Sequence, residues 1–288
     1  MSLTSVFLDS LNESLVIILI IFSLMVIVEL FTLKYKDKLI SFAKKNDFLR
    51  FVIASLFGIL PGCTGTFVMD GLYMAGLLGF GGLMATLIAT SGDEAFLIVS
   101  LATKGEISWT IVLILMSTLF LLGIIGAYLA RAFIKTSNMK FCKKCSIDYH
   151  KGEEFNLKHF LTKHIYKHIF KKHIWKIFLW VFAAIFIINI SSGFIDSSKL
   201  FTGGNLFFVL IIAALIGILP ISGPNAFLVV LFAKGVIPFS ILLTNSIIQD
   251  GHGLLPIIGF SIEDAVKLKT FNFVFGLVIG IVLLLIGF

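Results

Sequence analysis

The sequence predicts an all-α polytopic membrane protein that contains two inverted-topology repeats. Of its 288 residues, 58% are hydrophobic and 14% are charged, whereas soluble domains hold roughly 25% charged residues. In addition, residues 46–99 align without a gap to residues 205–258, and 16 of the first 53 aligned positions are identical. Each copy ends in a polar cluster inside an apolar run. Two related halves with polar breaks at membrane depth are typical of secondary transporters.

The basic residues indicate how the chain crosses the bilayer. If the N-terminus lies outside, 20 of the 23 Lys and Arg residues fall on the cytoplasmic side, and the exceptions are Lys104, Lys199 and Lys234. This asymmetry follows the positive-inside rule. The net charge of +7 therefore indicates topology and not a nucleic-acid partner. The chain divides into an N-terminal transmembrane repeat (1–134), a basic cytoplasmic loop (135–173) and a C-terminal transmembrane repeat (174–288).

The first half is predicted to begin with a spanning helix over Ser14–Leu33, followed by a basic loop from Lys34 to Asp47. The next two apolar segments, Phe48–Leu60 and Thr66–Leu78, have 13 residues each. They reach only about 20 Å, which is short of the ~30 Å hydrocarbon core. We expect a re-entrant hairpin that ends within the membrane, and two short or strongly tilted spans are the alternative. Its predicted hinge residues are Pro61, Gly62 and Gly65.

A broken helix and a continuous one complete the first half. Phe80–Leu101 is long enough to span, but Ser91-Gly92-Asp93-Glu94 interrupts it about halfway. Glycine weakens a helix there, and two adjacent carboxylates cannot face lipid. Trp109–Phe133 is the next predicted span.

The second half repeats this plan. We expect a span at Ile174–Ile190 and a second hairpin, Leu206–Leu219 with Asn225–Ile237, hinged at Pro220, Gly223 and Pro224. Pro238–Phe260 should be broken at Gln249–Gly253 and again at Pro256, and a charged turn at Glu263–Lys269 should precede the last span, Phe271–Gly287. Each half thus holds three spanning helices and one hairpin, up to ten transmembrane segments in total. Since the number per half is odd, the second copy runs through the bilayer upside down, and the two hairpin tips approach each other near the midplane.

Ionisable residues at this depth predict a cation site. An ionisable group at the bilayer centre costs roughly 2.5–3.5 kcal/mol, so its presence indicates a function. The predicted metal ligands are Asp93, Glu94, Asp250 and His252. Carboxylates with an imidazole suit Mn²⁺ and tolerate Fe²⁺, Zn²⁺ or Co²⁺. The predicted substrate pathway adds Cys63, Thr66, Ser91, Asn225, Asn245 and Gln249.

The alternative is that these carboxylates cap helix breaks or pair with each other in protonated form. Asp70 is a further ionisable residue within an apolar segment. Because Val229 occupies its repeat position, a structural role is favoured for Asp70.

The central loop contains Cys142 and Cys145, followed by five histidines. A C-x-x-C pair with distant histidines could bind Zn²⁺, but a clean second ligand pair at zinc-finger distance is missing. The favoured interpretation is a basic amphipathic helix on anionic lipid.

Several motifs resemble one known family, the ten-helix heavy-metal exporters, also labelled manganese transporters. They are Pro61-Gly62-Cys63, Leu72-Tyr73, residues 89–95, Gly223-Pro224-Asn225, residues 235–240 and residues 245–253. The resemblance extends over nearly the whole chain and implies a bacterial-type inner-membrane permease that exports a metal or metalloid. The family commonly has a cysteine at both hairpin tips. Here the second tip has Ile221-Ser222, which argues against paired-thiol ligation and favours manganese over arsenic.

Together these observations predict a secondary-active exporter of a divalent cation, with Mn²⁺ as the favoured ion, that is not an enzyme and has no resident cofactor. No G-x-x-x-x-G-K-[ST] motif is present, so the expected energy source is an ion gradient, with counter-transported protons. The oligomeric state is open. Two alternative functions remain open. One is an exporter of an arsenite-like or other anionic solute, and the other is an intramembrane aspartyl hydrolase that uses Asp93 and Asp250 as a dyad. Against the second, Asp93 aligns with His252 and not with Asp250.

Overall fold

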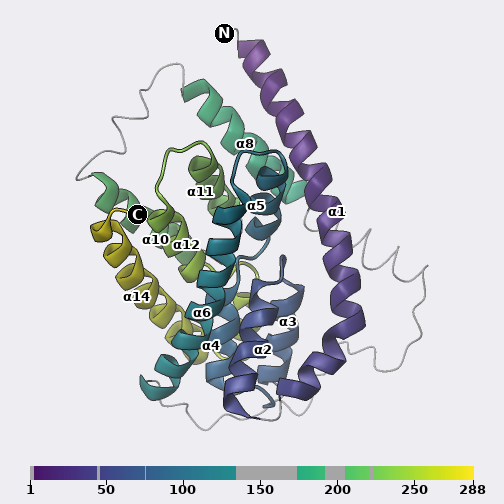
Figure 1. Ribbon diagram of the computed structural model, residues 1–288, viewed down its shortest axis with the longest axis vertical. Coiled ribbons are helices and arrows are strands. Elements are labelled where there is room, and N and C mark those ends of the chain that lie inside the picture. The colour runs from purple at the N-terminus through teal and green to yellow at the C-terminus, as the bar shows by residue number, and fades with distance from the viewer. Residues whose placement is uncertain (1–2, 44–45, 75, 134–173, 192–204, 221–222) are drawn as a thin grey trace.

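The computed structural model describes residues 3–43, 46–74, 76–133, 174–191, 205–220 and 223–288. These residues form helices and no strand (Figure 1), which confirms the all-α class. The first half consists of α1 (Leu3–Ala43), α2 (Asp47–Ile59), α3 (Thr64–Met74), α4 (Phe80–Ala89), α5 (Glu94–Thr103) and α6 (Trp109–Phe133). The second half consists of α8 (Trp175–Ser191), α10 (Asn205–Ile218), α11 (Gly223–Ala233), α12 (Phe239–Ile248), α13 (Leu254–Phe260) and α14 (Ile262–Ile286).

The described helices include long apolar ones that suit a bilayer. Four segments are long and apolar enough to cross it: Thr4–Ser23, Phe80–Thr103, Trp109–Phe133 and Ile262–Ile286. At 1.5 Å per residue, the 25 residues of α6 or α14 reach about 37 Å, which exceeds the ~30 Å hydrocarbon core. Many of their large apolar side chains are exposed, as expected where a protein faces lipid.

The two halves pack in the same way. Helix α2 packs on α4 and α6, and α10 packs on α12 and α14. The Thr86 hydroxyl donates to the Ala54 carbonyl at 3.1 Å, and the Asn245 amide donates to the Ala213 carbonyl at 3.0 Å. These donors and acceptors occupy matching repeat positions. In Figure 1, α2 and α3 lie in the lower half of the molecule, whereas α10 and α11 lie in the upper half. This arrangement is consistent with an inverted repeat, which stays a prediction.

Both predicted helix breaks are confirmed. Helix α4 ends at Ala89 before α5 begins at Glu94, and α12 ends at Ile248 before α13 begins at Leu254. In each break a glycine has a positive φ, +55° at Gly92 and +52° at Gly251, a conformation that L side chains rarely adopt. The Gly92 N–H donates to Thr90 Oγ1 at 3.2 Å, and the Gly251 N–H donates to Gln249 Oε1 at 3.0 Å. The two breaks therefore have the same backbone, closed by a side-chain oxygen two residues earlier.

Three predicted boundaries are wrong. Helix α1 continues to Ala43, through most of the predicted basic loop. Pro256 does not break a helix; it lies in the first turn of α13, where the missing N–H costs nothing. The predicted turn at Glu263–Lys269 is helical, because Ser261 caps α14 by accepting from the Asp264 N–H at 3.2 Å.

Two of the three basic residues that the topology prediction placed outside lie in one ion-pair cluster. Lys104, after α5, and Lys234, after α11, both pair with Glu13 on α1 and with Glu106. Burial is the largest single influence and alone would lower the pKa of Lys234, but the hydrogen bonds and charge interactions with Glu13 and Glu106 together outweigh it and raise this pKa. Glu13 and Glu106 therefore neutralise these two positive charges locally. Lys104 and Lys234 then count little when topology is inferred from the distribution of basic residues among the loops.

Candidate metal centre

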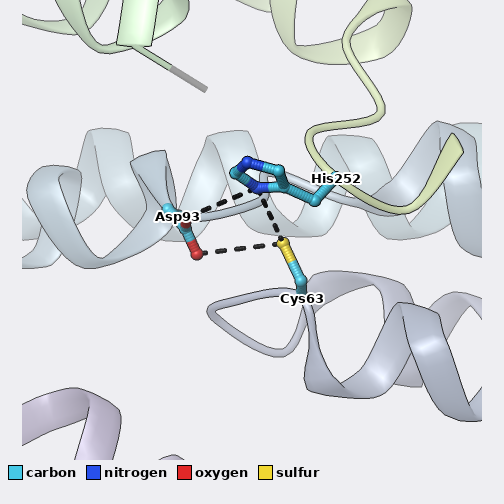
Figure 2. A group of neighbouring side chains, drawn as sticks. All are labelled: Cys63, Asp93 and His252. Atoms are coloured by element: carbon cyan, nitrogen blue, oxygen red, sulfur yellow. Dashed lines mark hydrogen bonds and ion pairs between the residues drawn. The ribbon is translucent and has the colours of Figure 1, made fainter. Parts of the chain in front are cut away.

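Three side chains of different chemistry meet where the first hairpin tip and the two helix breaks come together (Figure 2). Cys63 Sγ lies 3.8 Å from Asp93 Oδ1 and 3.9 Å from His252 Nδ1, and His252 Nδ1 lies 3.9 Å from Asp93 Oδ2. One potential ligand atom from each residue lies within 4.8 Å of the other two. Cys63 and Asp93 are buried, and the His252 side chain is 20% exposed.

Backbone contacts hold these three elements together. The Gly62 N–H donates to the Gly92 carbonyl at 2.9 Å, which places Cys63 beside Asp93. Gly62 itself has a φ of +89°, so the hairpin turn needs a glycine there. Gln249 Nε2 donates to the Thr90 carbonyl at 3.2 Å and joins the second break to the first. This bond helps to bring His252 near Asp93.

The spacing is close to that of a metal site. With bonds of about 2.3 Å to sulfur and 2.0–2.1 Å to nitrogen or oxygen, a tetrahedral Zn²⁺ would separate its ligand atoms by roughly 3.3–3.6 Å. The observed separations of 3.8–3.9 Å are a few tenths of an ångström wider. The Asp93–His252 distance is too long for a hydrogen bond between them. The three groups can therefore close on one ion with small side-chain movements.

Charge balance also favours a divalent cation. A bound thiolate and a bound carboxylate carry two negative charges, and a ligating histidine is neutral. The complex with a divalent ion would be neutral overall, which limits the cost of burying charge.

Glu94 lies next to this group and not within it. Both of its carboxylate oxygens are buried and have no hydrogen-bond partner in the described part of the chain. A Cβ on Gly92 would lie 2.8 Å from Glu94 Oε2, so this side chain folds back over the glycine. Asp70 is likewise fully buried with both oxygens unpartnered among the described residues.

Asp250, the fourth predicted ligand, is not brought into the group. Its Oδ2 accepts from Lys269 Nζ at 2.5 Å, and its Oδ1 accepts from Asn272 Nδ2 at 2.9 Å. Sequence reasoning missed Lys269 because it assigned this residue to a charged turn. The available signal was Ser261 followed by Glu263 and Asp264, an N-cap pattern that starts the helix earlier.

The predicted pathway residues lie around the breaks. Asn245 donates to Asn225 at 2.9 Å, the Thr66 and Thr90 hydroxyls are 3.3 Å apart, and Ser91 Oγ is buried without a hydrogen-bond partner in the described chain. Among the hinge residues, Gly65 leaves no room for a side chain, because a Cβ there would lie closer than 3.0 Å to the Phe57 carbonyl oxygen. The second hinge is described at Pro220, Gly223 and Pro224, of which the last two begin α11. Its central residues 221–222 and the Cys/His loop of residues 135–173 lie outside the described residues.

Counting each broken helix once, the described elements form ten segments, five in each half. No curated protein and no solved structure was found to match the chain. A family described as "Putative, 10TM heavy-metal exporter" matches residues 3–205 and 158–286. The ten helical segments, the apolar composition and this match over almost the whole length agree, and the chain belongs to this family of heavy-metal exporters, which are multi-pass membrane proteins.

Proposed function

We propose that this protein exports a divalent metal cation that binds to Cys63, Asp93 and His252. The observation that carries the proposal is the meeting of a thiol, a carboxylate and an imidazole from three separate elements within 4.8 Å. Each of these elements is a hairpin tip or a helix break, which are the places where transporters of this kind bind their substrates.

The ligand set favours a borderline ion. One sulfur, one nitrogen and one oxygen suit Zn²⁺ or Co²⁺ better than Mn²⁺, which prefers oxygen ligands. The prediction of Mn²⁺ from sequence counted Glu94 and Asp250 as ligands. Asp250 is bound to Lys269, so one of the oxygen ligands that the Mn²⁺ prediction counted lies outside the site. We therefore propose Zn²⁺ as the first ion to test.

The wider mechanism is part of the same proposal. Inverted repeats with re-entrant hairpins would let the site open alternately to either side of an inner membrane. Protons are the proposed counter-ion, because Cys and Asp ligands must lose protons when they bind metal. The similar packing of the two halves supports this mechanism.

Transport by the purified protein in proteoliposomes tests the proposal. Zn²⁺, Co²⁺, Mn²⁺ and arsenite would each be offered to the wild type and to Cys63→Ser, Asp93→Asn and His252→Gln. We expect Zn²⁺ transport to fall at least tenfold in each variant. His252→Gln should impair Zn²⁺ more than Mn²⁺, because the imidazole is softer than a carboxylate. Asp9→Asn, which removes an exposed carboxylate from α1, is the matched control and should transport normally.

Metal-dependent thermal stabilisation gives a second readout. A ligand that binds only the folded state adds about 2.7 kcal/mol at 100 times its Kd. The three variants should lose most of this stabilisation and the control should keep it. Near-normal Zn²⁺ transport by both Asp93→Asn and Cys63→Ser would refute the site. Transport of arsenite alone would instead support the alternative function, export of an arsenite-like solute.

A further inference from the structure

Lys269 is a buried lysine whose ammonium group is fully coordinated by oxygen. Its Nζ donates to Asp250 Oδ2 at 2.5 Å, to the Ile248 carbonyl at 2.8 Å and to the Gly217 carbonyl at 2.9 Å. An ammonium group has three donors, and these acceptors account for all of them. Asn272 Nδ2 holds the other oxygen of Asp250 at 2.9 Å, so the carboxylate is fixed in place.

The three acceptors have the electrostatics of a cation site. Gly217 is the penultimate residue of α10, and Ile248 is the last residue of α12. Carbonyls at the end of a helix have no partner within the helix and carry its partial negative charge. Two such ends and one carboxylate therefore point at the same position. In transporters with broken helices, carbonyls at these ends coordinate a coupling cation such as Na⁺.

We propose that Asp250 and the carbonyls of Gly217 and Ile248 form a second cation site, selective for a small monovalent cation, which the ammonium group of Lys269 fills permanently. This site is distinct from the candidate metal centre and does not depend on which ion that centre binds. Because the occupant is tethered, the protein needs neither Na⁺ nor K⁺ at this position.

The internal repeat supports the pairing of the two charges. The residue that matches Asp250 in the first half is the neutral Ser91. Helix α6, which packs on α2 and α4 as α14 packs on α10 and α12, contains no lysine. The Asp250 carboxylate and the Lys269 ammonium are thus both present in the second half, and neither has a counterpart in the first half. This is expected if the ammonium group is there to occupy the site that the carboxylate helps to form.

Removing the tethered cation tests the proposal. Lys269→Ala leaves Asp250 and both carbonyls facing a space that a small cation could enter. The midpoint of thermal unfolding would be measured in choline, ammonium, sodium and potassium chloride at equal concentration. The wild type should have the same midpoint in all four salts. Lys269→Ala should lose roughly 10 °C in choline and regain at least half of that loss in one or more of the small cations.

Two further variants complete the test. Lys267→Ala removes a half-buried lysine from the same helix, one that pairs with Glu263, and should show no salt-specific effect. Asp250→Asn/Lys269→Met removes both charges and should fold with the same midpoint in all four salts. If Lys269→Ala folds in no salt while the double variant folds, the need for a cation beside Asp250 is supported. A Lys269→Ala midpoint that is the same in choline and in the small cations would overturn the proposal, as would a double variant that also fails to fold.

Discussion

Replacing Gly253 by alanine should push the first hairpin away from the second helix break. Gly253 follows His252 directly, and a Cβ on it would lie closer than 3.0 Å to Thr66 Cγ2 and 3.1 Å from Leu87 Cδ2. Ordinary contact begins at 3.4 Å, so Gly253 and Thr66 must move apart by more than about 0.4 Å. The backbone of Gly253, with φ −64° and ψ −30°, suits alanine. The substitution should therefore act only through the steric clash of the new Cβ with its neighbours.

The expected magnitude combines two opposing terms. Overpacking costs about 1–3 kcal/mol, and the lower entropy of the unfolded chain returns about 0.4–1 kcal/mol. We expect a net loss of roughly 1–2 kcal/mol in the free energy of unfolding, measured by thermal denaturation. Because Thr66 lies three residues after Cys63, the shift should also separate Cys63 from His252. Stabilisation by Zn²⁺ should fall in the same variant.

Two matched variants isolate the cause. Thr66→Ser removes the methyl group that blocks the new Cβ and keeps the hydroxyl that lies 3.3 Å from Thr90 Oγ1. In the Gly253→Ala background it should restore most of the stability. Gly259→Ala, on the same helix α13, meets nothing within 4 Å and should stabilise the protein by about 0.4–1 kcal/mol. If Gly253→Ala is as stable as the wild type, or if Thr66→Ser does not rescue it, the close approach of these two elements is wrong.

Three further outcomes are expected. Gly58→Ala should lower the unfolding midpoint more than Gly217→Ala at the matching repeat position, because the first Cβ meets a backbone oxygen closer than 3.0 Å and the second meets side-chain carbons at 3.0–3.1 Å; equal midpoints would contradict this. Asn46→Ala should lower the free energy of unfolding by about 1 kcal/mol, measured by chemical denaturation, because the Asn46 side chain caps α2 by accepting from a backbone N–H at 2.7 Å. An unchanged stability would show that water replaces the cap. The hydrogen bond from Arg131 lowers the pKa of Asp47 in the folded protein. The ionised Asp47 carboxylate therefore stabilises the fold fully above its unfolded pKa of roughly 4, and this stabilisation is lost as the pH falls through the lower folded pKa. The wild type should therefore be more stable than Asp47→Asn at pH 7, and the two should converge in acid; a constant difference across the pH range would exclude this ion pair as the cause.

The helix breaks could be predicted from sequence because their signals are local. A glycine beside carboxylates or amides within an apolar run is enough to end a helix, whatever packs around it. Gly92 and Gly251 illustrate this, since each has a positive φ in the predicted place. The continuous helix α6 was predicted at its observed bounds for the same reason, as its sequence contains no such interruption.

The partners of the buried charges could not be predicted, because they depend on contacts between distant segments. Lys269 and Asp250 are 19 residues apart and lie on different elements. Cys63 was placed in the substrate pathway but not among the ligands, since its approach to Asp93 depends on the bond from the Gly62 N–H to the Gly92 carbonyl. Sequence alone identifies residues that can bind an ion, and tertiary structure decides which of them face each other.

The matching glycines in the two breaks also bear on how such a protein can diverge after gene duplication. Gly92 and Gly251 keep one backbone shape, while the residues that follow them, Asp93 and His252, differ in chemistry. Backbone shape and side-chain chemistry can therefore evolve separately at this point. A molecule made of two N-terminal halves would have two thiols and two carboxylates at its centre but no imidazole. The candidate metal centre therefore takes its thiol and carboxylate from one half and its imidazole from the other.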